Sequence, residues 1–326
     1  MLRGFDAQFS SIEDYILKIT ASIWEGGQMG DIERYYSREC VVESPLSVSR
    51  GIQPVIDGTA ATLQSFPDRR LLAEAVLVSG SDEIGFLSSH RILSPMVHAG
   101  SGRFGVPTNK PIFVRTIADC VCRDNQIQHE WLVRDHGAIA RQIGVLPSVL
   151  AQDWMRLDQN WQPPPPTTAP TPFRPIIDES RLCKTYIQSL HDTYGSLRSR
   201  FEVRPIGLSA EGVIAWHPGG FTSVGRHQRM GRIASLLDGL SFHSLDVEHC
   251  ARHPHIRPGI ESISCRFRAR FVHNQYGHFG EPTGSIVSVL VIQHSELQDG
   301  MVFREWTLLD EVSIWMQVLS GRRGPK

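Results

Sequence analysis

The chain lacks a net charge, a long hydrophobic run and a dense set of cysteines. Its 33 Lys+Arg balance 34 Asp+Glu, so it has no basic field and we expect no nucleic-acid partner. Its most apolar stretch, residues 286–292, is much shorter than the roughly 18 residues of a membrane span, so we expect no membrane partner. Asp6 and Glu13 stand near the N-terminus, where a secretion signal requires an uninterrupted apolar block, so we expect no such signal. Six scattered cysteines indicate reduced thiols, and we expect a cytoplasmic protein.

What the chain does contain is typical of a globular protein with a substantial core. The apolar share is 41% and the charged share is 21%. A length of 326 residues, at roughly 150 residues per domain, predicts two domains.

A proline-rich segment lies midway along the chain. Residues 162–175 read QPPPPTTAPTPFRP, and proline excludes both helix interiors and central strands. We interpret the segment as a semi-rigid spacer, although a protein-binding PxxP site is the alternative. The expected domains are residues 1–161 and 176–326, joined by residues 162–175.

The two flanks are copies of each other. With a shift of 175 residues, positions 89–142 match positions 264–317 without a gap, at 17 identities in 54 positions. The sequence FGVPT at 104–108 aligns with FGEPT at 279–283. Two large copies indicate a tandem duplication that forms a pseudo-dimer, because solenoids are built from three or more short repeats.

Each copy combines early helices with later strands. In the first copy, apolar spacing predicts helices at 11–23, 31–36 and 52–65, and strands at 71–78, 84–92, 112–122 and 127–135. Asp124-Asn125 and Asp299-Gly300 predict hairpin turns. This order of elements predicts an α+β fold with an antiparallel sheet.

The last predicted strand carries the candidate chemistry. Strict alternation puts His129, Trp131 and Asp135 on one face, and Trp306 and Asp310 on the same face of the second copy. If helices cover this face, Asp135 lies at the edge of an apolar interior, where desolvation raises a carboxyl pKa toward neutrality. His98, or His273 in the second copy, would then polarise a carbonyl group or stabilise an enolate. The alternative, left open here, is that Asp135 caps the helix that begins near residue 137.

These residues carry a family resemblance. Phe-Pro-Asp at 66–68, His98, the G-x-P-T sequence at 105–108, Glu130 with Asp135, and Gln-Ile-Gly at 142–144 resemble the SnoaL-like polyketide cyclase (ester cyclase) family. This family has the nuclear transport factor 2-like, or ketosteroid-isomerase-like, fold. The resemblance implies two tandem cone-shaped domains, each a curved antiparallel sheet closed by N-terminal helices, packed as a pseudo-dimer. Further homodimerisation is left open.

The resemblance also implies cofactor-independent acid–base chemistry on a hydrophobic carbonyl compound, by aldol cyclisation, isomerisation or hydration. Asp135 and His98 match the family's catalytic pair. We expect no cofactor and no metal, and a small hydrophobic carbonyl ligand as the partner. The pocket is expected to be lined by Trp131, His129, Trp24, Asp68 and Arg91. The matching positions of the second copy are Asp310, His273, Trp306 and Arg266.

The second copy departs from the family pattern. It lacks Phe-Pro-Asp and Gln-Ile-Gly, reading Leu240-Ser241-Phe242 and Gln317-Val318-Leu319 at the matching positions. The first copy is therefore the better candidate for a working site. The erosion also motivates an alternative function, a non-catalytic module that binds a hydrophobic ligand or a protein.

Two further clusters offer weaker chemistry. His249, Cys250, His253 and His255 match no standard zinc spacing, and we interpret them as part of a polar loop. Cys120 and Cys122 lie two residues apart on a predicted strand, and we interpret them as small core residues.

Overall fold

The chain divides into two compact units. The computed structural model describes residues 2–197, 207–255 and 257–322. Residues 1–150 together with 163–174 form the first domain, and residues 151–162 together with 175–326 form the second. Residues 151–162 thus group with the second domain, and residues 163–174 of the proline-rich segment group with the first. The main chain and hydroxyl of Thr167 donate to Glu43 Oε2 at 2.7 and 2.5 Å.

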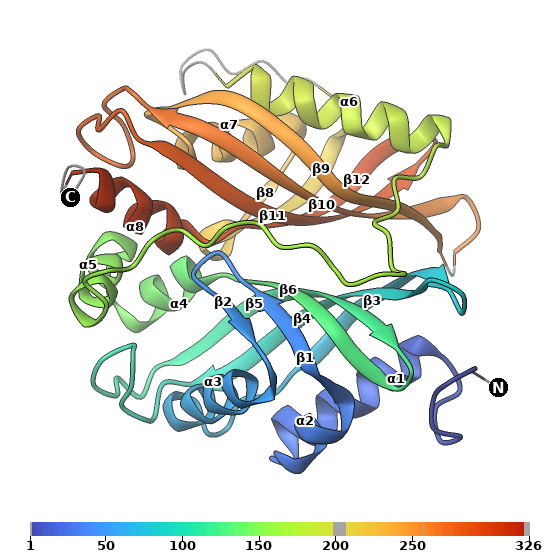
Figure 1. The fold of residues 1–326 in the computed structure, drawn as a ribbon. Helices are drawn as coiled ribbons and strands as arrows, with labels where there is room; N and C mark the ends of the chain where they lie inside the picture. Colours follow the sequence, from blue (N-terminus) through green and yellow to red (C-terminus); the bar gives the residue numbers. More distant parts are fainter. Residues whose placement is uncertain (1, 198–206, 256, 323–326) are drawn as a thin grey trace. The chain divides into compact units, whose positions relative to one another are not determined.

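The first domain contains a six-stranded sheet in the order β2-β1-β6-β5-β4-β3 (Figure 1). Its strands are β1 (Tyr36–Glu43), β2 (Val48–Arg50), β3 (Leu72–Ser81), β4 (Gly85–Val97), β5 (Pro111–Arg123) and β6 (Gln126–Arg134). All neighbouring pairs are antiparallel except β1 and β6, which run parallel. The sheet is therefore mixed, and the expectation of a purely antiparallel sheet is corrected by this one pair.

Helices cover one face of the first sheet (Figure 1). They are α1 (Ile12–Thr20), a π-helical turn η1 (Ala21–Glu25), α2 (Gly30–Tyr35) and α3 (Ile52–Ser65), and the chain continues into α4 (His136–Ile143) and α5 (Pro147–Leu157). Helix α1 begins where the Ser11 side chain accepts a hydrogen bond from the Asp14 main chain. Its buried face carries Tyr15, Ile16 and Ile19.

A β-bulge in β6 decides which side chains face these helices. Asp124 and Asn125, at φ 49° and 63°, form the predicted hairpin turn. Ile127 pairs with Cys122, but His129 pairs with Val121, so Gln128 is an extra residue on β6. Beyond the bulge the alternation is inverted, because partners across an antiparallel pair point to the same face.

The inverted alternation corrects the prediction for the last strand. Glu130 pairs with Cys120 and Leu132 pairs with Ala118, so Glu130, Leu132 and Arg134 face the helices. The face with His129, Trp131 and Asp135 points the other way. Strict alternation counted from Ile127 fails at one residue, and every later side chain changes sides.

The second domain repeats this arrangement, with strand order β8-β7-β12-β11-β10-β9. Its strands are β7 (Ser209–His217), β8 (Phe221–Val224), β9 (Leu240–Pro254), β10 (Ile260–His273), β11 (Ile286–Gln298) and β12 (Met301–Leu308). Its helices are α6 (Arg181–Gly195), η2 (Pro218–Gly220), α7 (Arg226–Leu236) and α8 (Glu311–Gly321). Strands β7 and β12 form the parallel pair, and Phe303 is the extra residue of the corresponding bulge. The predicted α+β fold of two tandem domains is confirmed.

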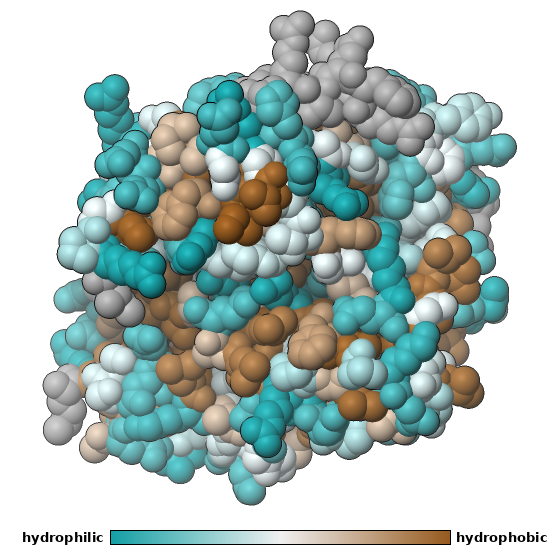
Figure 2. Space-filling model, turned by 180° about the vertical axis from the view of Figure 1, so that it is seen from behind, coloured by the Kyte–Doolittle hydropathy of each residue, from teal (hydrophilic) through white to brown (hydrophobic). Residues whose placement is uncertain are grey.

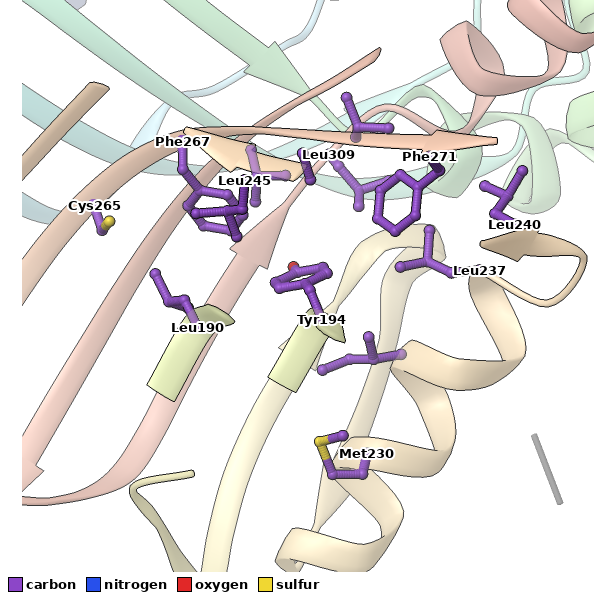
Figure 3. Packing of buried hydrophobic residues seen from close by; sticks show 14 of the residues in the cluster. Leu190, Tyr194, Met230, Leu237, Leu240, Leu245, Cys265, Phe267, Phe271 and Leu309 are labelled. Atoms are coloured by element: carbon purple, nitrogen blue, oxygen red, sulfur yellow. The ribbon is translucent and has the colours of Figure 1, made fainter. Parts of the chain in front are cut away.

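A cluster of large buried side chains packs in the interior of the second domain. Figure 3 shows Tyr194 from α6 directed toward Phe267 and Leu245 of the sheet, with Leu237 and Leu309 close by. The Tyr194 and Phe267 ring centroids are 5.5 Å apart. A larger set of buried residues shares this cluster, including Leu190, Met230, Leu240, Cys265 and Phe271.

One ion pair lies inside that apolar interior. Arg229 of α7 donates to both carboxylate oxygens of Glu305 on β12, at 2.9 and 2.8 Å. Arg229 is 5% exposed and Glu305 is 2% exposed. The bidentate geometry compensates much of the desolvation of both charges.

Polar and apolar side chains mix on the surface. Figure 2 shows one face, where hydrophobic residues are interspersed among hydrophilic ones. None of the described helices combines the length and apolar character that a bilayer crossing requires.

We expect Arg229→Met to destabilise the second domain by about 3–5 kcal/mol, because it leaves the Glu305 carboxylate buried without its partner. The double variant Arg229→Met/Glu305→Gln should recover part of that loss. Hydrogen exchange of β11 and β12 amides in the full chain measures both. Equal destabilisation in the single and double variants would contradict the pairing argument.

Candidate functional site

A cavity of about 70 Å³ lies in the first domain between the sheet and the helices. Ile16 and Ile19 of α1 and Trp24 of η1 form its helix side, and side chains of β4, β5 and β6 form its sheet side. The ionisable side chains in its wall that the argument uses are those of Tyr36, Arg69, His90, Glu130 and Arg134, and most of the exposed wall is apolar. This combination of apolar walls and few polar groups is typical of small-molecule sites.

A second chamber of about 220 Å³ adjoins the first. We call the first the inner chamber and the second the outer chamber. Both chambers are lined by the same six residues, which are Trp24, Tyr36, Arg69, Glu130, Leu132 and Arg134. The outer chamber extends past the β1–β2 turn and α3, and it adds Arg103 and His136 to the wall. Three arginines against one glutamate give the outer chamber a positive field.

Glu130 is the buried carboxyl group of the cavity. It is 6% exposed, and it accepts a hydrogen bond from the Tyr36 hydroxyl at 2.9 Å. Burial raises the pKa of Glu130, while the Tyr36 hydrogen bond and the charge of Arg134 partly offset that rise. Burial also raises the pKa of Tyr36 well above its ordinary value, which keeps the hydroxyl a proton donor.

Arg69 supplies a buried cation. It is 7% exposed, and its Nε and Nη2 atoms find no hydrogen-bond partner among the described residues. Burial lowers the pKa of Arg69 to about 9, the charge of Arg134 lowers it further, and the charge of Glu25 partly offsets both. The guanidinium therefore stays charged at neutral pH. Main-chain hydrogen bonds from Arg69 to Phe66 and from Arg70 to Pro95 hold the loop that places it.

His90 of β4 is the second polar group without a partner. It is 2% exposed, and no described residue hydrogen-bonds its Nε2. Burial lowers the pKa of His90 to about 4, so the imidazole is neutral at physiological pH.

The predicted catalytic pair lies elsewhere. Asp135 is the N-cap of α4, and its Oδ1 accepts a hydrogen bond from the Ala138 main chain at 2.9 Å. His98 Nδ1 is 3.2 Å from the Thr108 hydroxyl, and its ring packs against Phe66. Neither Asp135 nor His98 lines the two chambers. A catalytic role for this pair stays a prediction.

Of the predicted lining residues, Trp24 lies in the wall of both chambers. The other four face different surroundings. The rings of His129 and Trp131 are 4.0 Å apart, and His129 Nε2 is 2.9 Å from the Thr167 hydroxyl. Two further contacts complete the set: Arg91 pairs with Glu74 at 3.2 Å, and Asp68 accepts from the Val97 main chain at 2.8 Å. The bulge at Gln128 explains the change of face for His129 and Trp131.

The matching residues of the second domain make the same kinds of contact. Asp310 caps α8, and His273 Nδ1 is 3.1 Å from the Thr283 hydroxyl. Trp306 stacks on Trp216 at 4.6 Å, and Arg266 pairs with Glu248 at 3.2 Å. The His–Thr contact and the Asp cap occur both in the first domain, which has the cavity, and in the second, where large side chains pack at the corresponding position. This favours a structural role for Asp135, His98 and their counterparts.

The cavity residues, in contrast, differ between the copies. Under the 175-residue shift, His90 aligns with Cys265, Arg134 with Leu309, and Ile92 with Phe267. Glu130 aligns with Glu305, whose carboxylate is bound by Arg229. The position of the chamber in the first domain thus corresponds to packed side chains in the second (Figure 3).

Potential metal ligands do not converge in the described parts of the chain. No group of three or more His, Cys, Asp or Glu side chains there could hold a metal ion. His249, Cys250 and His253 lie on strand β9 and not in a polar loop, and His255 follows the end of that strand. There, His253 Nε2 is 2.8 Å from the Ser264 hydroxyl and His249 accepts from the Ile176 main chain. Cys120 and Cys122 are buried core residues.

The chain is similar to known proteins in structure, and not in sequence. No protein-family model and no curated protein matches the sequence. A SnoaL-like polyketide cyclase from Agrobacterium tumefaciens is 20% identical, covering 42% of this chain and 100% of its own, with a TM-score of 0.33. A candidate SnoaL-like polyketide cyclase from Jannaschia sp. CCS1 is 16% identical over 40% of this chain and 89% of its own, with a TM-score of 0.37.

AclR from Streptomyces galilaeus, a candidate hydroxylase, is 18% identical over 40% of this chain and 94% of its own, with a TM-score of 0.35. Two of these three structures carry the name of the family that the motifs resemble.

Sequence reasoning missed Tyr36, Arg69, His90 and Glu130. One signal was available: Glu130 is retained as Glu305 in the repeat, in the same Glu-Trp dipeptide. Arg69 follows directly on Phe-Pro-Asp at 66–68, but nothing in the sequence marks it as unpaired.

Acid should destabilise the first domain through His90. The unfolded chain binds a proton on this imidazole below its ordinary pKa of 6.5, whereas the folded chain binds it only near 4. Stability is therefore lost as the pH falls from 6.5 to 4, by about 3 kcal/mol at most. His90→Cys, which introduces the residue of the second domain, should flatten this dependence. Hydrogen exchange of β4 and β5 amides against pH measures it, and an unchanged slope would contradict it.

Two substitutions separate capping from proton transfer at Asp135. Asp135→Ala removes the acceptor for the Ala138 main chain and should cost about 1 kcal/mol of stability. Asp135→Asn keeps a good cap but cannot exchange a proton, so its stability should stay close to wild type. Thermal unfolding measures both, and a large loss in the Asn variant would contradict capping as the role.

Proposed function

We propose that the first domain is an enzyme that transfers protons on a small hydrophobic carbonyl compound bound in the two-chamber cavity. One observation carries the proposal: a buried carboxyl group, Glu130, lies in the wall of a mainly apolar cavity and is held there by Tyr36. Its raised pKa suits a group that takes a proton and later returns it.

The proposed reaction begins at a carbon next to the carbonyl group of the ligand. Glu130 takes the proton, and the electron pair of the broken C–H bond moves onto the carbonyl oxygen. Arg134, whose charge already acts on Glu130, stabilises the enolate that forms. Ile16, Ile19 and Ile92 exclude water around the reacting carbon.

Two outcomes are open to the enolate. Its carbon attacks a second carbonyl group of the same ligand, a C–C bond forms, and the proton on Glu130 passes to the new alkoxide. Alternatively, the proton returns to a different carbon, which isomerises the ligand. Either outcome leaves Glu130 in its starting state, so no external oxidant or reductant is required.

The alternative is a binding module without turnover, which the second domain motivates. There the Arg229–Glu305 ion pair and large apolar side chains occupy the corresponding interior. That domain keeps the fold without the arrangement that surrounds Glu130, so the fold does not depend on an open cavity.

We expect the wild-type chain to catalyse exchange of α-hydrogens for deuterium in D2O on some members of a panel of cyclic ketones and β-keto esters. Glu130→Gln should reduce this exchange by about a hundredfold or more, the usual contribution of a positioned general base. Proton NMR of the ketone follows the loss of the α-hydrogen signal.

Glu43→Gln is the matched control. Glu43 is 1% exposed on the neighbouring strand β1 and does not line the cavity. It should retain the exchange rate of the wild type. Saturable ketone binding without exchange would instead favour the binding module, and equal exchange by the Glu130→Gln variant would overturn the role of this residue.

A further inference from the structure

The strongest unexplained group in the cavity is the guanidinium of Arg69. Buried arginines are normally paired with a carboxylate or bind several oxygen atoms, because an unpaired buried charge is costly. Arg69 lies in the wall of both chambers, and two of its nitrogens have no hydrogen-bond partner among the described residues.

The nearby acidic groups already have other partners. Glu130 accepts the Tyr36 hydroxyl, and the Glu25 carboxylate accepts the main-chain N–H of Leu71 at 2.5 Å. The charge of Glu25 also acts on Arg69, but no hydrogen bond joins the two side chains. Arg134 lies close enough to Arg69 to lower its proton affinity, so the two cations repel each other. An anion placed between them would relieve that repulsion and supply the missing acceptor.

We propose that Arg69 is the binding site for a carboxylate group of the ligand, so that the first domain takes a carboxylate-bearing apolar molecule. The proposal rests on the proposed function, since it names the class of substrate for the same cavity. Arg69 binds the carboxylate where the two chambers meet, and the apolar body of the ligand occupies the inner chamber beside Ile16 and Ile19.

The surroundings favour a monoanion with an apolar body over an inorganic anion. The inner chamber is lined mainly by apolar side chains, which a small inorganic ion would leave uncompensated. Glu130 lies in the same wall and repels a dianion more strongly than a monoanion. Arg103 extends the positive field into the outer chamber, which draws the charged end of a ligand inward.

The second domain fits this interpretation. The buried arginine there, Arg229, has its carboxylate in the protein itself, as the bidentate pair with Glu305. The first domain has a buried arginine, Arg69, with two nitrogens that no described residue hydrogen-bonds, and Glu25 acts on it only through its charge. The fold thus contains one internally compensated cation and one whose partner would arrive with the ligand.

The test compares acids with their neutral amides on the full chain. The probes are hexanoate, phenylacetate and phenylpropionate, their primary amides, and inorganic phosphate, with binding measured by calorimetry. We expect the wild type to bind the acids about tenfold or more tighter than the amides, the size of one charge-assisted hydrogen bond. Arg69→Met should lose this preference while it still binds the amides, and Arg69→Lys should keep part of it.

The matched control is Arg70→Met. Arg70 is the next residue, is exposed and does not line the cavity, so its loss should leave the preference unchanged. Equal affinity of wild type for acids and amides, or a preference that survives in Arg69→Met, would overturn the proposal. Tighter binding of phosphate than of any acid would also overturn it. Deuterium exchange on neutral ketones is scored separately, so failure of the carboxylate site is distinguishable from failure of the proton-transfer function.

Discussion

The side of the sheet on which the cavity residues lie depends on one unpaired residue in a strand. Gln128 has no partner on β5, so the strand gains one residue and every side chain after it changes face. This places Glu130, Leu132 and Arg134 under the helices and sends Trp131 and Asp135 to other surroundings. The hydrogen bond of Tyr36 to Glu130, and the shared wall of the two chambers, both follow from that register.

Local pattern was sufficient to predict most of the fold. The helix over 52–65 and the hairpins at Asp124 and Asp299 were visible because capping, spacing and turn chemistry act over a few residues. Strand β1 was not visible, because a bulge interrupts its pairing with β6 and its burial does not alternate. A parallel partner distant in sequence leaves no local signal, so the mixed sheet could not be inferred.

The candidate site was less predictable than the fold, for a physical reason. Asp135 was selected because it stands in a motif and beside Trp131, and the same position suits an N-cap equally well. Arg69 and His90 matter because buried nitrogens of both line the cavity without a hydrogen-bond partner among the described residues. Lack of a partner is a property of three-dimensional surroundings, and residue type and spacing do not encode it. Comparison of the two copies does mark these positions, since Cys265 and Leu309 of the second domain replace His90 and Arg134 of the first.

The bulge occurs at equivalent positions of both domains, at Gln128 and at Phe303. Two separate insertions at the same register would require a coincidence, so the bulge belonged to the single-domain ancestor before its duplication. The inward face of the last strand was therefore inherited by both descendants. Divergence between the two interiors then took place through side-chain replacement on a shared backbone, as Phe267 and Leu309 illustrate. A cavity at this position can thus be opened or closed by a few substitutions, without any change in the path of the backbone.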